Sequence, residues 1–170
     1  MNHAPIAVKE IAEGMRNAGS TLSIGTENNL NQSIALLTAA NTTVQNISKS
    51  STGLRTIVAR IRNVKAELDD LGESMTNVEY DEIVQALTKH NVALTGQNGQ
   101  LRNTYDILQD LSEAWKNMSE NEQAALAKTL SGTRQQNCSN HCYTVHVHSD
   151  VFEKKPIELL ETPKAIYTTT

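Results

Sequence analysis

The sequence predicts an all-α fold of several amphipathic helices in an elongated or loosely packed array. Apolar residues recur three and four positions apart in several segments, which is the spacing of one helix face. Hydrophobic residues make up 38% of the 170-residue chain but aromatic residues only 4%, which suits thin apolar stripes. Both cysteines lie close together near the end, so disulfides do not organise the fold. We expect a helical region over residues 1–137 and an irregular, poorly ordered tail over residues 138–170.

The first helix is expected over residues 6–16, with Pro5 in its first turn and Gly19 beyond its end. A second helix is expected after Thr26, whose hydroxyl can cap the free amides. Its apolar set is Leu30, Ile34, Leu37 and Ala40, which predicts one buried stripe. The β-branched residues 42–44 weaken helix formation, so a break is expected within residues 41–51.

The strongest helical pattern upstream begins at Ser51 or Thr52 and ends before Gly72. Its apolar positions are Leu54, Ile57, Val58, Ile61, Val64 and Leu68. Its other face carries Arg55, Arg60, Arg62 and Lys65, followed by Glu67, Asp69, Asp70 and Glu73. We expect this to be a solvated charged face, with contact to nucleic acid or an acidic partner as the alternative.

A shorter helix is expected over residues 80–89, with Ile83, Val84 and Leu87 facing inward. The dipeptide Asn98-Gly99 that follows is typical of a type I′ turn. It predicts a short β-hairpin near residues 92–102, which would have to lean on neighbouring helices.

Two further helices are expected at residues 104–131. Asn103 or Thr104 caps the first, and Ser119 with Glu122 has the capping-box spacing at the start of the second. Gly132 suits the left-handed residue beyond its end, and the short linker predicts an antiparallel pair. Trp115 is interpreted as core rather than as a binding-site aromatic. The packing or interaction residues predicted over the whole chain are Leu54, Ile57, Val58, Ile61, Ile107, Leu108, Leu111, Trp115, Leu126 and Leu130.

Three blocks occur in order: residues 22–41 (LSIGTENNLNQSIALLTAAN), residues 51–73 (STGLRTIVARIRNVKAELDDLGE) and residues 104–137 (TYDILQDLSEAWKNMSENEQAALAKTLSGTRQQN). The last contains the pattern Y-x-I-L-x-x-L-x-x-x-W, then E-Q-A-A, then G-T-R-Q. Together they resemble the phage tail tape measure protein family. The resemblance implies a structural protein that sets tail length during assembly and occupies the tail tube before DNA ejection.

The resemblance also implies partners and a location. The expected partners are the tail tube protein, tail assembly chaperones and, through its helices, further copies of the chain. The expected location is the virion tail, or the bacterial host cytoplasm during assembly. From Cys138 the sequence departs from the family pattern, in which another apolar helix usually follows. An interrupted or frame-shifted, prophage-encoded gene would explain the change, and a different C-terminal extension is the alternative.

Other functions find less support in the sequence. A formal charge of −4 argues against a nucleic-acid coat, so such contact is expected to be incidental. No apolar run approaches a membrane span, and no signal peptide is recognisable. The chain lacks a serine elbow, a P-loop and the H-E-x-x-H pattern. We therefore expect no catalysis, small-molecule substrate or cofactor.

Zinc-type donors gather only near the end of the chain, at Cys138, His141, Cys142, His146 and His148. Their spacing is not that of a standard finger, so an accidental cluster is favoured over a zinc site. Two rival functions remain: a small helical protein-binding or regulatory module, and a zinc-bound nucleic-acid module that would use this cluster with residues 55–65.

Overall fold

A computed structural model describes residues 7–23 and 28–132, and over these residues it contains seven α-helices and no strand. The helices are α1 (Val8–Ser23), α2 (Leu30–Val44), α3 (Ile47–Ile61), α4 (Lys65–Asp70), α5 (Asn77–Lys89), α6 (Thr104–Trp115) and α7 (Glu120–Ser131). The all-α prediction is confirmed. None of these helices is both long and apolar enough to span a lipid bilayer. The predicted tail, residues 138–170, lies outside the described residues.

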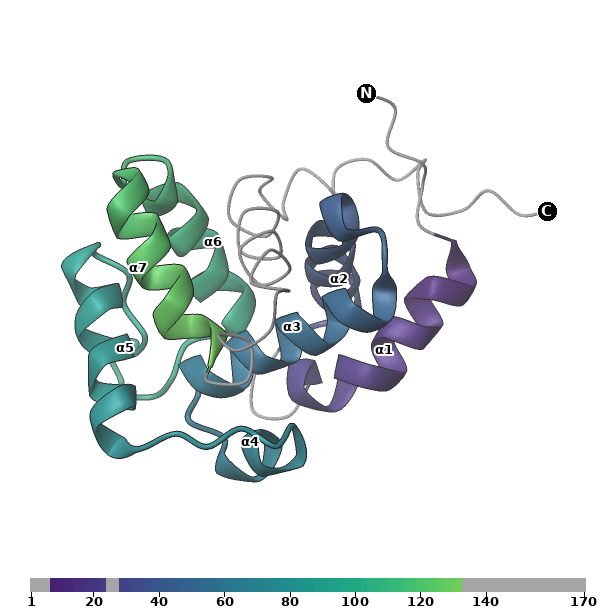
Figure 1. Ribbon diagram of the computed structural model, residues 1–170, viewed down its shortest axis with the longest axis horizontal. Helices are drawn as coiled ribbons and strands as arrows, with labels where there is room; N and C mark the ends of the chain where they lie inside the picture. Colours follow the sequence, from purple (N-terminus) through teal and green to yellow (C-terminus); the bar gives the residue numbers. More distant parts are fainter. Residues whose placement is uncertain (1–6, 24–27, 133–170) are drawn as a thin grey trace.

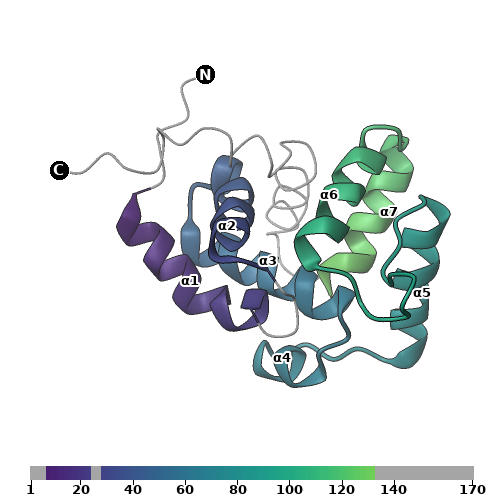
Figure 2. The same cartoon turned by 180° about the vertical axis from the view of Figure 1, so that it is seen from behind.

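Helix α3 runs through the middle of the molecule and contacts five other helices (Figure 1). Helices α1 and α2 lie at one end of α3, α5 and α7 at the other, and α4 beneath it; the reverse view shows the same order (Figure 2). Eleven of its fifteen residues are buried. A helix covered on several sides buries more than one stripe. The predicted single apolar stripe with a solvated opposite face is therefore wrong for α3.

Six of the seven described helices share one hydrophobic core. Side chains from α1, α2, α3, α5, α6 and α7 meet in a single cluster of buried residues. Many of them, among them Leu54, Ile83 and Leu108, have no exposed surface. In this part of the chain the predicted array of helices is organised around α3, and its helices share a core instead of packing only with their neighbours in sequence.

Helix α2 also departs from its predicted pattern. Leu30, expected to face inward, is 62% exposed, whereas Leu36 has no exposed surface. Leu37 and Ala40 are fully buried, as the spacing indicated. The reason is that α2 packs against α1, α3 and α6 at once, so its buried surface is wider than a single stripe.

Side-chain caps set where most of the helices begin. The caps of α2, α3, α5, α6 and α7 are Asn29, Asn46, Thr76, Asn103 and Ser119, and each side chain accepts a backbone N–H from the first turn of its helix. Three of these ends form full capping boxes, including the predicted pair of Ser119 and Glu122. Thr26, predicted to cap α2, lies outside the described residues; the cap is Asn29.

Left-handed residues stop four of the described helices, with Gln45 at the end of α2 as the first. Asn63, Gly72 and Asn91 have φ of 53°, 67° and 59°, and each lies just past a helix end. At α3, the Asn63 N–H donates to the Arg60 carbonyl and the Val64 N–H to the Ala59 carbonyl, which is the Schellman pattern. The single helix predicted from Ser51 to before Gly72 is therefore two helices, α3 and α4, with a turn between them.

Most other predicted helix boundaries lie within a few residues of the observed ones. The break expected within residues 41–51 falls at Gln45 and Asn46, and Gln45 takes up a left-handed φ of 48°. Helix α1 continues through Gly19 to Ser23, past the predicted end. Helix α5 begins at Asn77, three residues before the predicted start.

The loop between α5 and α6 contains one isolated antiparallel bridge, between Thr95 and Leu101, and no strand. Gly99 has a φ of 75°, but Asn98 does not have positive φ, so the turn is not type I′. The Gly99 N–H donates to the Gly96 carbonyl at 3.0 Å. The predicted chain reversal is present, but the predicted turn type is wrong.

Replacing Gly14 by alanine tests how closely α1 approaches α3. A Cβ on Gly14 would lie 2.9 Å from Cδ1 and 3.0 Å from Cγ1 of Ile47, which is too close. Overpacking costs about 1–3 kcal/mol, more than the about 0.5–1 kcal/mol that alanine gains over glycine in a helix. We expect Gly14→Ala to lower the free energy of unfolding, measured by urea denaturation.

Gly19→Ala is the matched control, because its new Cβ would lie at an ordinary 3.5 Å from the Met15 methyl carbon. It lies in the same helix, so the same gain in helix propensity applies and it should raise stability. Equal effects of the two substitutions would show that α1 and α3 do not pack this closely.

Candidate functional site

The structure buries all ten residues predicted to pack or interact. Those of α3 are Leu54, Ile57, Val58 and Ile61; those of α6 are Ile107, Leu108, Leu111 and Trp115; those of α7 are Leu126 and Leu130. They belong to the same core cluster. The face that these residues form is an internal junction between α3 and the last two helices, not an open surface.

The three sequence blocks meet at this junction. Residues 22–41 reach from the end of α1 into α2, residues 51–73 contain α3 and α4, and residues 104–137 begin with α6 and α7. Helix α3 packs against both α2 and α7. The pair α6 and α7 is thus not a separate unit, since α7 makes close backbone approaches to α3 and α5.

Arg60 connects α3 to the end of α7. Its side chain is buried, at 3% exposure, and its Nε donates to the Thr129 carbonyl at 3.3 Å. Burial lowers the pKa of Arg60, while Glu79 and Glu73 act in the opposite direction. The guanidinium therefore supplies a donor and positive charge to the carboxyl end of α7, where the helix dipole favours a cation.

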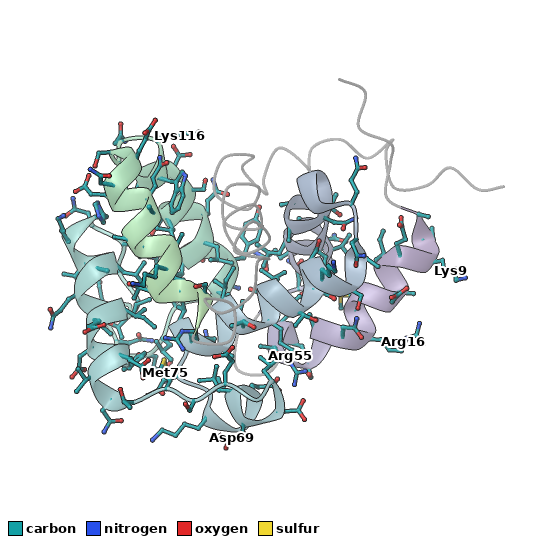
Figure 3. All side chains as sticks on the ribbon, viewed as in Figure 1. Lys9, Arg16, Arg55, Asp69, Met75 and Lys116 are labelled. Carbon is teal, nitrogen blue, oxygen red and sulfur yellow. The ribbon has the colours of Figure 1, made fainter. Side chains whose placement is uncertain are left out.

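Arg55 connects α3 to α4 and α1. Its guanidinium binds Glu67 at 2.7 Å and also Asp70, and Glu67 accepts the Thr21 hydroxyl at 2.7 Å. Figure 3 shows Arg55 reaching from α3 towards α4. Partial burial acts to lower the pKa of Arg55, but the hydrogen bonds to Asp70 and Glu67 outweigh it and the pKa is raised. The acidic residues after the turn thus fold back onto the arginine before it.

Arg62 connects the end of α3 to the start of α6. Its Nη1 donates to the Arg102 carbonyl at 3.1 Å and the Thr104 hydroxyl at 3.2 Å. Of the four basic residues predicted to face solvent, only Lys65 is exposed. The predicted solvated face is wrong, and the basic patch that a nucleic-acid module would need at residues 55–65 is largely used for internal contacts.

The end of α7 meets a buried carboxylate. Gly132 has φ of 78° and ψ of 173°, a region that is essentially restricted to glycine, and not the left-handed helical region that was predicted. A Cβ here would lie 2.7 Å from Oε2 of Glu73, which is only 5% exposed. The glycine of the G-T-R-Q block is therefore required by its backbone angles, and the Glu73 carboxylate occupies the space that a Cβ would fill.

The start of α7 is held by a second carboxylate. Glu122 accepts the backbone N–H of Ser119 at 3.1 Å and pairs with Lys89 of α5 at 2.9 Å. The hydrogen bond from Lys89, followed by those from Ser119, lowers the pKa of Glu122 to about 2. This carboxylate joins α5 to α7 at the end of α7 opposite to Gly132.

The predicted zinc donors Cys138, His141, Cys142, His146 and His148 lie outside the described residues. Within residues 7–23 and 28–132, no group of three or more histidine, cysteine or acidic side chains could hold a metal ion. The Cys/His prediction stays untested.

Sequence reasoning missed Arg60 and Glu73, because both stand among other charged residues in what looked like a solvated run. A signal was present on α3. Between its large apolar residues stand small ones, and all are buried: Ser50, Ser51, Gly53, Thr56 and Ala59. Small residues on the second face of a helix allow another helix to approach closely, so they indicate burial on that face too.

No family model matches the chain, and no curated protein or solved structure matches it.

The depressed pKa of Glu122 predicts that the free energy of unfolding falls at acid pH. Its folded pKa of about 2 lies below the ordinary glutamate value of 4.5, so the stabilisation is present above pH 4.5 and is lost as pH falls towards 2. Glu122→Gln keeps the capping-box geometry but cannot titrate. We expect the variant to flatten the fall in unfolding free energy over this range, measured by urea denaturation at several pH values.

Glu120→Gln is the control for Glu122, because Glu120 lies in the same helical turn. It removes an acidic group from the same turn and leaves the contacts of Glu122 with Ser119 and Lys89 in place. An unchanged pH profile in Glu122→Gln, or the same change in both variants, would mean that the capping box and the Lys89 pair do not hold the carboxylate as described.

Gly132→Ala tests the contact at the end of α7. Backbone strain alone should cost about 1–3 kcal/mol, and the clash with Glu73 adds to it. We expect the cost to fall when Glu73 is first shortened to alanine, and to persist in Glu73→Gln, which keeps the side-chain size. Chemical denaturation of each variant with and without Gly132→Ala measures the coupling.

If Gly132→Ala costs the same free energy of unfolding whether position 73 holds glutamate, alanine or glutamine, the backbone angles alone require the glycine. The comparison with Glu73→Gln separates side-chain size from charge, since removal of the carboxylate charge also changes the surroundings of Arg60.

Proposed function

We propose that this chain carries a segment of a phage tail tape measure protein, with a structural and not a catalytic role. The observation that supports the proposal is the ordered set of three blocks that resemble this family, at residues 22–41, 51–73 and 104–137. Short motifs recur by chance in helical proteins, whereas three blocks in a fixed order do so less readily.

The packing of the described residues is compatible with one inherited unit. Helices from the three blocks pack on α3, and the glycine of the G-T-R-Q block lies against Glu73, which belongs to the second block. A contact between blocks far apart in sequence gives a physical reason why they would occur together. The argument concerns the fold of the unit, and its task in a tail rests on the resemblance.

A protein that measures length needs a fixed distance for each residue. A continuous helix supplies about 1.5 Å per residue. The described helices contain between 6 and 16 residues and are separated by turns. Under this proposal there are two possibilities. The helices merge into a longer continuous helix inside the tail tube, or the segment stays folded and adds less than about 1.5 Å of length per residue.

The proposed partners are the tail tube protein, the tail assembly chaperones and further copies of the same chain. The proposed location is the virion tail, or the bacterial host cytoplasm during assembly. Contact with nucleic acid would be incidental, since Arg55 and Arg62 are tied to internal acceptors and Arg60 is buried. No small molecule and no cofactor enter the proposal.

A helical binding or regulatory module without a tail role is the second candidate, and one observation favours it. The described helices cover their apolar surfaces within the chain, and the large hydrophobic residues left exposed there are scattered over separate elements: Val8, Leu30, Val78 and Leu101. A self-contained helical domain of this kind needs no tube around it. Under this proposal the surface, and not the length, would carry the function.

In-frame deletion within the phage or prophage gene that encodes this chain separates the two candidates. Removing α5 to α7, from Asn77 to Gly132, should shorten the tails seen by electron microscopy. A shortening near 1.5 Å for every deleted residue is expected if the segment extends as helix in the tail. A smaller but reproducible shortening is expected if it stays folded.

The matched control inserts the same number of helix-forming residues at the exposed Asn98-Gly99 turn and should lengthen the tails. Tails of normal length from both the deletion and the insertion would overturn the proposed role in measuring length. The binding module would then remain as the better account of the fold.

A further inference from the structure

The loop between α5 and α6 contains the only Asn-Gly dipeptide of the chain, Asn98-Gly99. Both residues are exposed, and nothing lies within 4 Å of the position that a Cβ on Gly99 would occupy. Asparagine is among the thermolabile residues, and a glycine after it leaves its side-chain carbonyl open to attack from the backbone. Other described asparagines precede residues with a side chain or lie inside a helix.

We propose that Asn98 is a site of spontaneous deamidation in the folded protein. The backbone nitrogen of Gly99 attacks Cγ of Asn98, so that a new N–Cγ bond forms and the Cγ–Nδ2 bond breaks. Nδ2 leaves as ammonia and takes with it the proton of the Gly99 amide. Water then adds to one of the two carbonyls of the cyclic imide, giving either aspartate or isoaspartate at position 98.

The hydrogen bonds of the turn hold the Asn98 side chain and the Gly99 N–H, and they must open before the reaction. The Asn98 side chain is held over the turn, since its Oδ1 accepts the Gln100 N–H at 3.1 Å and its Nδ2 donates to Gln100 Oε1 at 3.2 Å. The Gly99 N–H donates to the Gly96 carbonyl at 3.0 Å and must leave it before the attack. An exposed turn held by so few bonds opens readily, so the folded state should not block the reaction.

The products would change how the loop holds α6. Arg102 binds the Ala93 carbonyl at 2.9 Å and Asp110 of α6 at 2.6 Å, and its side chain passes beside Gly96 on the same side as Asn98. A carboxylate at position 98 adds a negative charge on the same side of the loop as the Arg102 side chain, and this charge would compete with Asp110 for the guanidinium. Isoaspartate also lengthens the backbone, which breaks the pairing of Thr95 with Leu101. Position 98 is thus placed to loosen the connection between α5 and α6 as the protein ages.

The test incubates the full-length folded chain in mildly acidic and in mildly alkaline buffer and follows tryptic peptides by mass spectrometry. The peptide containing Asn98 should gain about 1 Da and separate into aspartate and isoaspartate forms, faster at alkaline pH. The exposed Asn121 of α7 serves as the control within the same sample. Hydrogen exchange of residues 94–102 should increase in the aged protein and not in an aged Asn98→Gln variant.

Gly99→Ala should slow the reaction severalfold, because the added methyl group hinders the attack. Asn98 reacting no faster than Asn121 would overturn the proposal. Reaction at Asn98 in urea but not in the folded chain would overturn it too, since the turn would then protect the site.

Discussion

Burial of α3 on several sides is the constraint on which the rest of the structure depends. A helix in this place needs large apolar residues to fill the core and small ones to let neighbours approach, and α3 has both: Leu54 and Ile57 on one side, Thr56 and Ala59 on the other. It is also the helix that contacts α1, α2, α4, α5 and α7. A polar change on α3 would therefore disturb several interfaces at once, whereas the same change on α5 would disturb few.

Two arginines of α3 and Arg62, which follows its last residue, show how a central helix can carry charge. Arg55 binds carboxylates, Arg60 a carbonyl at the end of α7, and Arg62 a carbonyl and a hydroxyl at the start of α6. Each contact joins α3 to a different part of the chain. A buried ion pair adds little net stability over well-packed apolar residues, but removing one partner of such a contact is costly. These contacts thus favour one arrangement of the helices over others more than they strengthen the fold.

The sequence was sufficient for local features and insufficient for those that depend on distant contacts. The capping box of Ser119 and Glu122 was predictable because both partners lie within one turn. The turn at Asn63 was missed, because asparagine carries only a weak stop signal until its left-handed backbone is seen. Without that turn, the sequence did not show that Glu67 and Asp70 fold back onto Arg55. The charged residues after α3 were therefore predicted to face solvent. The second face of α3, lined by small residues, could have been predicted to be buried. The spacing of the large apolar residues alone indicated only one buried face.

The helix ends bear on the proposed role of the chain in a tail. Side-chain caps start α3, α5 and α7, and left-handed residues stop α3, α4 and α5. Each cap satisfies backbone groups that a continuous helix would satisfy by itself, so merging the helices would exchange one set of hydrogen bonds for another at little net cost. The real cost of extension is exposure of α3, whose core residues would need a new cover. A tube wall or a second chain could supply one, and water could not. Under the proposed function, length measurement by this segment would therefore need an enclosing partner that covers α3.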